Sequence, residues 1–452
     1  MASPGSERQL ELTRWMPFSQ YASSMSTLSY SDEYNAYERF LHCTTIPSVL
    51  HAIQSVKISA PLFPLLRRLT VTITRPGGWL DDLLPHIPSC QLQHLSIEYH
   101  ASHSYPEGLL NLMLNLSDRT PSLCRLKLKL YDHCDPVRNA QRIDIFINSE
   151  KQRSLQVLFL DCAYLSPCTF SRIARFPCLR FLTIRLRETT MPELLSNSLS
   201  FDFLAKLDLR VTQAKLAISF FRCIGSAIPH VTHISISIDE VLPFDRDLGE
   251  ISYQIRRLCL PTSFKSLHIL FKELAAEDSP PPLVPENPGY GLHMFQPLLD
   301  FSLRVLNLSV QLPLFPPTLI YVTQMASAWV NLISIRIDVG SIVPFDRRLL
   351  VPISKLVPFF QACKHLRQLY IPFRYLISDH LPSSGIQAYA LLNLGLGWVT
   401  PNSRDAVALG RWLGIVAPGL PEIELVDTNG DTVVCGIDEL TKFDTMVDWN
   451  SD

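Results

Sequence analysis

The sequence predicts an α/β solenoid, a curved, horseshoe-shaped stack of strand-turn-helix units with a parallel sheet on the concave side and helices outside. Three observations predict this fold. A short pattern of large apolar residues recurs about thirteen times between residues 66 and 427, the text between copies often has helical periodicity, and a proline precedes many of the copies. A single unit cannot cover its own apolar residues, so the units must stack.

The recurring pattern is typical of a short, half-buried strand. Its first, fourth and sixth positions are large and apolar in every copy, and the alternation from the fourth position onward has the period of a strand. Successive copies begin 24 to 39 residues apart, which predicts irregular repeats. The copies begin at Leu66, Leu92, Leu123, Leu155, Leu179, Leu204, Val231, Phe264, Leu303, Leu332, Leu366, Leu391 and Leu420.

Helices are expected between several of the strands. Apolar residues recur at helical spacing in residues 109–122, 216–229, 318–330 and 405–418. Proline fixes φ and lacks an N–H donor, so a proline before a strand ends the preceding helix. Such prolines are Pro64, Pro88, Pro121, Pro177 and Pro229.

Copies such as "LRRLTVTI" from Leu66 and "LRFLTIRL" from Leu179 resemble the leucine-rich-repeat family, L-x-x-L-x-L, over roughly residues 50–426. That resemblance implies the horseshoe fold and a binding role, without naming a partner. The family often has Asn or Cys at the ninth position. Here Thr74, His100 and Ala163 occupy it, so we expect irregular turns.

A narrower resemblance concerns the segment "NAYERFLHCTTIPSVLHAIQSVKISAPLFPLLRRLTV" and the divergent units after it. They look like the region that follows the F-box in fungal F-box and leucine-rich-repeat proteins. In that family the F-box binds a ubiquitin-ligase adaptor and the repeats hold the substrate. Residues 1–50 show no F-box pattern, so an adaptor is expected as a partner only if an F-box is encoded upstream of Met1.

The ends of the stack need caps, because an exposed terminal strand and core are unfavourable. We expect residues 1–35 to be a flexible N-terminal segment and residues 36–65 an N-terminal cap with a helix near 37–43 and a strand at 55–58. The repeats then cover residues 66–426, with a proline-rich insertion at 279–291. Residues 427–452 are expected to form a C-terminal hairpin and cap.

The stretch "DTNGDTVVCGIDE" in that cap resembles a calcium loop at first sight. Its sixth position is Thr432 where a calcium loop needs Gly, and its twelfth is Asp438 where a bidentate Glu is usual. Prolines also interrupt the segment before it. Asn429-Gly430 is instead a preferred pair for a tight hairpin turn.

Composition excludes several classes of protein. Forty Lys and Arg balance forty-two Asp and Glu, so no global basic excess favours nucleic acid. The sequence has no signal peptide and no apolar run that could span a membrane. Eleven cysteines without paired spacing favour a reducing compartment, so we expect the protein in the cytoplasm or nucleus.

Catalytic, cofactor and metal motifs are absent from the sequence. There is no G-x-S-x-G, phosphate-binding glycine loop or H-E-x-x-H pair. The polar run Asp132 to Asp135 cannot converge on one ion and is interpreted as a turn. We therefore expect a non-enzymatic protein with no cofactor.

The concave face carries the candidate site. The third, fifth and seventh positions of each copy point away from the apolar core, and in the early copies they are mostly basic with two aromatics. Such a surface suits an acidic or phosphorylated protein segment, although charges on a sheet also serve solubility alone. The candidate protein-binding residues are Arg68, Arg125, Lys127, Lys129, Phe159, Phe181, Arg185, Lys206 and Arg210.

The function expected from these observations is a protein-protein interaction scaffold. The fungal resemblance implies the substrate-recognition part of a ubiquitin-ligase receptor. The alternative is a regulator of another enzyme, because long horseshoes also resemble ribonuclease inhibitors and activators of small GTPases.

Overall fold

The structure is a computed structural model, and its described parts fall into two compact units. The units are Met1–Leu204 (unit 1) and Ala205–Asp452 (unit 2), and each is taken by itself. The structure describes residues 24–31, 63–73, 90–100, 120–130, 147, 154–161, 165–187, 199–239, 245–271, 292–310, 319–339, 351–352, 356–374, 388, 390–397, 403–426 and 432–437.

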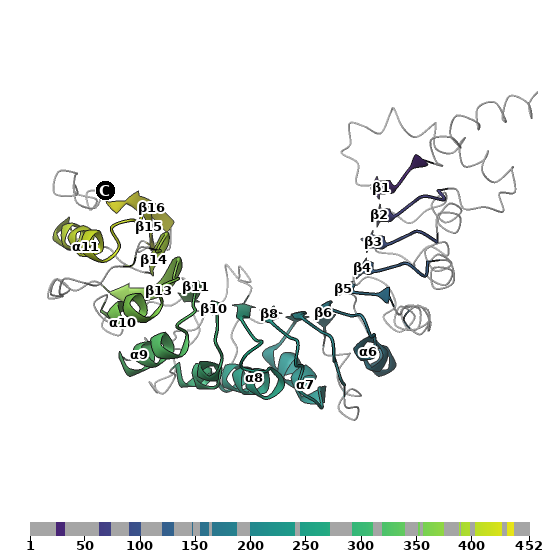
Figure 1. The fold of residues 1–452 in the computed structure, drawn as a ribbon, viewed down its shortest axis with the longest axis horizontal. Coiled ribbons are helices and arrows are strands. Elements are labelled where there is room, and N and C mark those ends of the chain that lie inside the picture. The colour runs from purple at the N-terminus through teal and green to yellow at the C-terminus, as the bar shows by residue number, and fades with distance from the viewer. Residues whose placement is uncertain are drawn as a thin grey trace, which may run out of the picture. The chain divides into compact units, whose positions relative to one another are not determined.

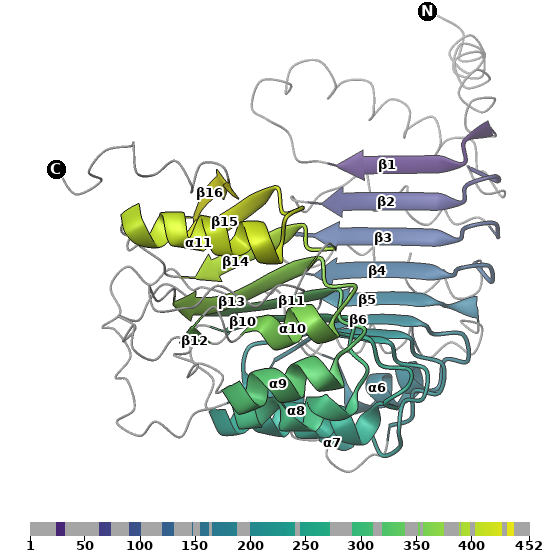
Figure 2. The ribbon, with the colours of Figure 1, turned by 60° about the vertical axis from the view of Figure 1, so that its left-hand side comes forward.

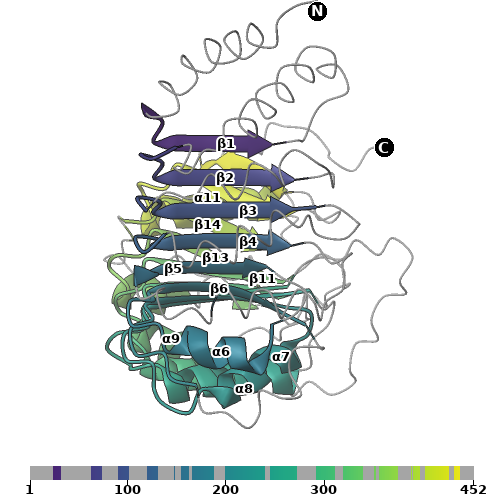
Figure 3. The ribbon, with the colours of Figure 1, turned by 90° about the vertical axis from the view of Figure 1, so that its right-hand side faces the viewer.

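Unit 1 is built on a parallel sheet whose strands follow one another in chain order. Each strand pairs in parallel with the next, as Figures 2 and 3 show by the common direction of the arrows. Its elements are β1 (Thr27–Ser31), β2 (Arg68–Ile73), β3 (His94–Tyr99), β4 (Arg125–Leu130), β5 (Val157–Asp161), α6 (Pro167–Ala174) and β6 (Phe181–Leu186).

Unit 2 repeats the arrangement, and more of its helices lie within the described residues. Its strands pair in parallel up to β15, the two-residue β12 pairs only with β13, and the last pair is antiparallel. Figure 1 shows the helices on one side of these strands. The elements are β7 (Lys206–Val211), α7 (Ala214–Cys223), β8 (His233–Ile238), α8 (Asp245–Leu258), β9 (Ser266–Phe271), η6 (Leu292–Asp300), β10 (Val305–Val310), α9 (Leu319–Ala328), β11 (Ser334–Val339), β12 (Val351–Pro352), α10 (Val357–Ala362), β13 (Gln368–Arg374), β14 (Asn393–Gly397), α11 (Ser403–Val416), β15 (Glu422–Val426) and β16 (Thr432–Gly436).

The thirteen predicted strands are all present, and each begins at the third position of its copy. The first, fourth and sixth positions lie in the core. In the copy that starts at Leu123, for example, Leu123, Leu126 and Leu128 are all buried. The chain therefore has the α/β leucine-rich-repeat fold that its apolar pattern predicts.

The prolines before the strands occupy the second position of a tight turn. The carbonyl of Phe63 accepts a hydrogen bond from the N–H of Leu66 at 3.1 Å, which places Pro64 at the position where a β-turn favours proline. The same turn contains Pro121, Pro177, Pro229 and Pro418. These prolines thus build the turn that starts the strand, beyond the expected role of ending a helix. Pro88 lies outside the described residues.

One backbone carbonyl in each repeat fixes where the next strand starts. The carbonyl of Arg67 accepts hydrogen bonds from the N–H groups of Gln93 and His94, both at 2.9 Å. The same shared acceptor recurs at the second position of successive repeats within each unit up to β14, and it is missing before β15, where Pro421 has no N–H. Because both donors are held by one acceptor, these strands enter their sheet in the same register.

The helices expected at 216–229, 318–330 and 405–418 are confirmed as α7, α9 and α11. They pack over the apolar residues of the unit 2 strands. The indole N–H of Trp329, which follows α9, donates to the carbonyl of Leu298 at 3.2 Å, and the thiol of Cys363 donates to the carbonyl of Trp329 at 3.3 Å. These buried bonds join consecutive repeats behind the sheet. Residues 109–122 lie outside the described part.

The ends differ from expectation at one point. Strand β1 lies within the segment 1–35 that was expected to be flexible, and it pairs in parallel with β2. Leu28 and Tyr30 of β1 are register partners of Leu69 and Val71, so β1 is a divergent copy of the repeat that was not recognised from the sequence. The helix and strand expected at 37–43 and 55–58 within the cap 36–65, and the insertion at 279–291, lie outside the described residues. At the other end β16 pairs antiparallel with β15, as the two strands of a hairpin do, and the predicted turn at Asn429-Gly430 lies outside the described residues.

Candidate functional site

The candidate residues stand on one face of each sheet, because strand side chains alternate. In β4, Leu126 and Leu128 are buried in the core, and Arg125, Lys127 and Lys129 alternate with them on the opposite face. We call the surface formed by the third, fifth and seventh positions of the repeats the open face.

All nine predicted site residues occupy such positions, but the structure divides them between the two units. Seven lie on β2, β4, β5 and β6 of unit 1: Arg68, Arg125, Lys127, Lys129, Phe159, Phe181 and Arg185. The remaining two, Lys206 and Arg210, lie on β7 of unit 2. The basic surface of unit 1 is therefore considered by itself.

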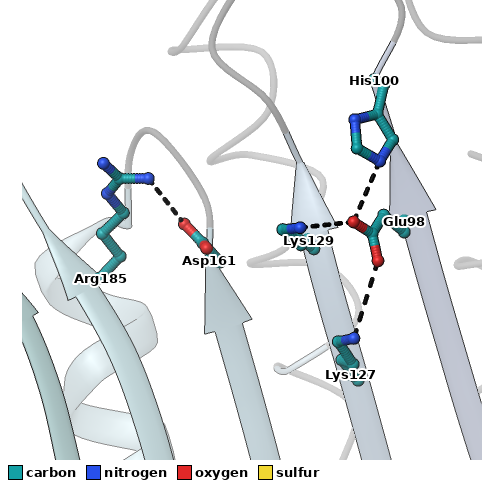
Figure 4. Close-up of polar contacts among 6 residues, drawn as sticks. All are labelled: Glu98, His100, Lys127, Lys129, Asp161 and Arg185. Carbon is teal, nitrogen blue, oxygen red and sulfur yellow. Dashed lines mark hydrogen bonds and ion pairs between the residues drawn. The ribbon is translucent and has the colours of Figure 1, made fainter. Parts of the chain in front are cut away.

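Glu98 neutralises part of that surface. Its carboxylate accepts a hydrogen bond from the Lys129 ammonium, and the Lys127 Nζ lies 3.7 Å and the His100 Nε2 3.0 Å from it, as Figure 4 shows. Burial by itself raises the pKa of Glu98, but the Lys129 hydrogen bond and the charges of Lys129, Lys127 and His100 together lower the pKa below its usual value. The two lysines are thus already engaged within the protein.

Arg185 is likewise engaged. Its Nη1 lies 3.4 Å from the Oδ1 of Asp161, which is itself buried at the end of β5 (Figure 4). Breaking the pair would leave a buried carboxylate without this cation, which is unfavourable. The contact therefore stabilises the sheet, whether or not Arg185 also binds a partner.

Two arginines of the open face lack such partners. Arg68 on β2 and Arg125 on β4 are exposed, and among the described residues neither makes an ion pair. His94 lies between them in register, since it is the cross-strand partner of both. Burial and the charges of Arg125 and Arg68 lower the pKa of His94, which favours its neutral ring between the two arginines.

The two predicted aromatics behave differently. Phe159 lies beneath Lys127, whose Nζ is 5.5 Å from the ring centroid, a cation-π contact. Phe181 is 43% exposed on the open face, and its cross-strand neighbour Val157 is half-buried. Phe181 is thus a large apolar side chain that the fold itself does not cover.

Two histidines lie side by side on the open face of unit 2, on the neighbouring strands β8 and β9. The rings of His233 and His268 lie 4.9 Å apart, and the His268 Nε2 is 3.1 Å from the Ser266 hydroxyl. Burial, with the charges of Lys206 and His268, lowers the pKa of His233 to about 4, and burial with the Lys206 charge lowers the pKa of His268. Both rings are therefore neutral at pH 7.

Farther along unit 2, three neighbouring strands form a stack on the open face. The Arg336 guanidinium lies 4.6 Å from the centroid of the Tyr370 ring, and that ring covers Gly395 on the next strand. A Cβ at position 395 would overlap the ring, so only glycine permits this approach. The repeat pattern placed Arg336 and Tyr370 on this face but did not single out the stack.

The sequence analysis missed two features of the unit 1 site. One is the neutralisation of Lys129, which cross-strand alignment signals, because Glu98 and Lys129 share the seventh position of adjacent repeats and are register partners. The other is His94, which holds the third position between the arginines of the adjacent repeats. Aligning the copies by position rather than counting their charges would have found both.

Within the part of the chain that the structure describes, no group of three or more His, Cys, Asp or Glu could hold a metal ion. Among these same residues no helix is both long and apolar enough to cross a membrane. The eight cysteines in the described ranges are free thiols.

Comparison with known proteins adds little beyond this geometry. No protein-family model and no curated protein matches the chain. Among solved structures, the chain is similar to an internalin (inlF) from Listeria monocytogenes str. 4b F2365, with 12% sequence identity and a TM-score of 0.36 over 80% of this chain and 84% of that chain.

Proposed function

We propose that the protein is a non-enzymatic scaffold that binds other proteins through the open face of its repeats. One observation carries this proposal. In unit 1 the open face presents, on the alternate strands β2, β4 and β6, two arginines that make no ion pair among the described residues and an exposed phenylalanine, and the fold does not need these groups for its own core. Arginine and aromatic side chains of this kind are enriched where proteins bind one another.

The expected partner is an acidic or phosphorylated protein segment. Arg68 and Arg125 offer planar donor groups that suit carboxylate and phosphate oxygens. Nucleic acid fits less well, since Lys127 and Lys129 are occupied by Glu98 and the adjacent strands carry apolar residues.

A finer proposal rests on the sequence resemblance of residues 35–71 and the repeats after them to fungal F-box and leucine-rich-repeat proteins. By that resemblance the chain is the substrate-recognition part of a ubiquitin-ligase receptor in the cytoplasm or nucleus. Co-purification of a ligase adaptor with the native full-length protein supports it. Absence of adaptor from that material reduces the function to a plain binding scaffold.

Affinity capture with charge-reversed variants tests the scaffold itself. We expect the double variant Arg68→Glu with Arg125→Glu to lose the partners that the wild-type chain captures. Lys215→Glu is the matched control, because Lys215 is an exposed cation on helix α7 rather than on the open face. Equal capture by the wild type and the double variant contradicts binding through the open face of unit 1.

A captured enzyme whose activity falls or rises when the protein is added would instead favour the alternative function, regulation of another enzyme. Activity assays on each captured partner distinguish the two functions.

A further inference from the structure

The third positions of unit 1 form one row across the sheet with two distinct halves. Cross-strand register places Arg68, His94, Arg125, Val157 and Phe181 in that order on adjacent strands β2 to β6. The first three side chains are basic or titratable, and the last two are apolar. We call these five residues the first row.

The basic half is suited to a single anion of high charge. Adjacent strands lie about 4.8 Å apart, so the backbones at Arg68 and Arg125 are about 10 Å apart on either side of His94. Two arginine side chains can therefore converge above the histidine from opposite sides. A phosphate monoester carries nearly two negative charges and three acceptor oxygens, enough to engage both guanidinium groups at once.

The apolar half lies at a fixed distance from that point. Val157 is two strands from His94 and Phe181 is three, which corresponds to about 10 and 14 Å across the sheet. An extended peptide advances about 3.3–3.6 Å per residue, so this distance spans about three or four residues. A segment that crosses the strands along the first row would meet both halves.

We infer that the first row binds a protein segment bearing a phosphorylated serine or threonine and, about three or four residues away, a large apolar side chain. The phosphate lies between Arg68 and Arg125, and the apolar side chain packs on Val157 and Phe181. This inference deepens the proposed function and rests on it. It adds which residues contact the phosphate and what spacing the partner must have.

Neighbouring residues favour such a segment over a polyanion. A nucleic acid needs cations that continue along its backbone. Along this row the cations end at Arg125, and in the next positions of the same strands Lys127 and Lys129 are paired with Glu98. A carboxylate carries one charge and so balances the charge of one arginine, whereas a phosphate monoester balances nearly two.

His94 provides a local reporter of the bound phosphate. The groups that face it are Arg68 from β2 and Arg125 from β4, while Glu98 on its own strand is engaged by Lys129. Both arginines lower the pKa of His94 in the free protein. A phosphate placed between them supplies the opposite charge, so the His94 pKa rises on binding.

The test uses the full-length protein and fluorescein-labelled peptides with one phosphoserine and one phenylalanine about three or four residues before or after it. We expect one of these peptides to bind about tenfold to a hundredfold more tightly than its unphosphorylated form, because charge-assisted hydrogen bonds are lost without the phosphate. Replacing the phenylalanine by serine should weaken binding about tenfold. Histidine NMR titration of the complex should show the raised His94 pKa.

Matched variants locate the contacts. We expect Arg68→Gln and Arg125→Gln each to abolish most of the preference for the phosphorylated over the unphosphorylated peptide. We expect Phe181→Ser to abolish the preference for the peptide with phenylalanine over the peptide with serine. Arg67→Gln and Phe203→Ser serve as controls, since both residues are exposed but lie at the turns before strands rather than on the open face. Circular dichroism shows whether each variant remains folded.

The outcomes separate this inference from the proposed function. Equal affinity for phosphorylated and unphosphorylated peptides, unchanged binding by both arginine variants, or equally tight binding of a single-stranded RNA overturns the phosphate site. If the protein still captures the same partners after phosphatase treatment of those partners, the scaffold function stands and the phosphate inference fails. If the protein captures no partner, whether or not the candidate partners have been treated with phosphatase, the proposed function itself fails.

Discussion

At the scale of single residues, the accessible charge of the open face depends more on which basic side chains form ion pairs than on how many basic residues the sequence places there. Glu98 contacts His100 and the two lysines, Lys127 and Lys129, that were predicted to be part of the basic surface, whereas Arg68 and Arg125 remain unpaired among the described residues. The accessible cations are therefore fewer and more localised than composition predicts. This concentrates any binding of anions on the first row.

Glu98 should make stability depend on pH in the acid range. Its folded-state pKa is lowered below the ordinary glutamate value of 4.5, so its contribution to stability is present above that value and is lost as the pH falls through the folded pKa. We expect Glu98→Gln to be less stable than wild type at pH 7 and to lose less stability on acidification. Urea unfolding midpoints between about pH 3 and pH 7 measure this.

Glu422→Gln is the control for that measurement, because Glu422 is exposed on β15. Identical pH profiles for the wild type and Glu98→Gln contradict the role assigned to the cluster.

Gly395 and Gly414 should respond oppositely to the same substitution. A Cβ at Gly395 overlaps the Tyr370 ring, so Gly395→Ala must displace the ring from Arg336 and should cost about 1–3 kcal/mol of unfolding free energy. Gly414 lies in α11 with nothing within 4 Å of such a Cβ, so Gly414→Ala should stabilise by up to about 1 kcal/mol. Denaturant unfolding with near-UV circular dichroism checks both, and destabilisation of similar size at the two positions would refute the packing argument.

At the scale of elements, strands were easier to predict than what surrounds them. The strand of each repeat has a strict apolar alternation that the buried core requires, and so all thirteen appear in the structure. Strand β1 keeps the same spacing of large apolar residues, with Met25, Leu28 and Tyr30 at the first, fourth and sixth positions, but Met and Tyr in place of two leucines kept it from being recognised as a copy. Positions on the open face were predictable for the same reason as the strands. Ion pairs between strands depend on which residues become neighbours, so they can be predicted only by aligning adjacent copies position by position.

Helix α6 offers a direct test of capping. The hydroxyl of Ser166 accepts a hydrogen bond from the N–H of Thr169 at 3.2 Å and so satisfies a donor at the start of the helix. We expect Ser166→Ala to reduce stability by about 0.5–2 kcal/mol. Ser171→Ala, within the same helix, removes a hydroxyl that caps nothing and should not destabilise. Chemical denaturation of both variants gives the comparison, which fails if they are equally destabilised.

At the scale of the whole molecule, thiol reactivity should report which parts of the chain are packed. Burial raises the pKa of Cys259 and of Cys363 to about 12, whereas Cys90, Cys168 and Cys178 are exposed. Since the thiolate is the reactive form, iodoacetamide near pH 8 should label the exposed cysteines quickly and leave Cys259 and Cys363 unmodified until the protein unfolds. Peptide mass spectrometry over a time course measures this, and labelling of Cys259 as fast as Cys178 in the native protein would contradict the described packing.

The shared backbone carbonyl at the second position of the repeats limits the effect that insertions and deletions have as the sequence evolves. Loops between strands differ in length, yet each strand still starts at the same position of its copy. An insertion or deletion in a loop therefore leaves the outward residues of every other strand where they were. Mutation can then alter the partner preference one exposed side chain at a time, while the hydrogen bonds that align the strands stay intact.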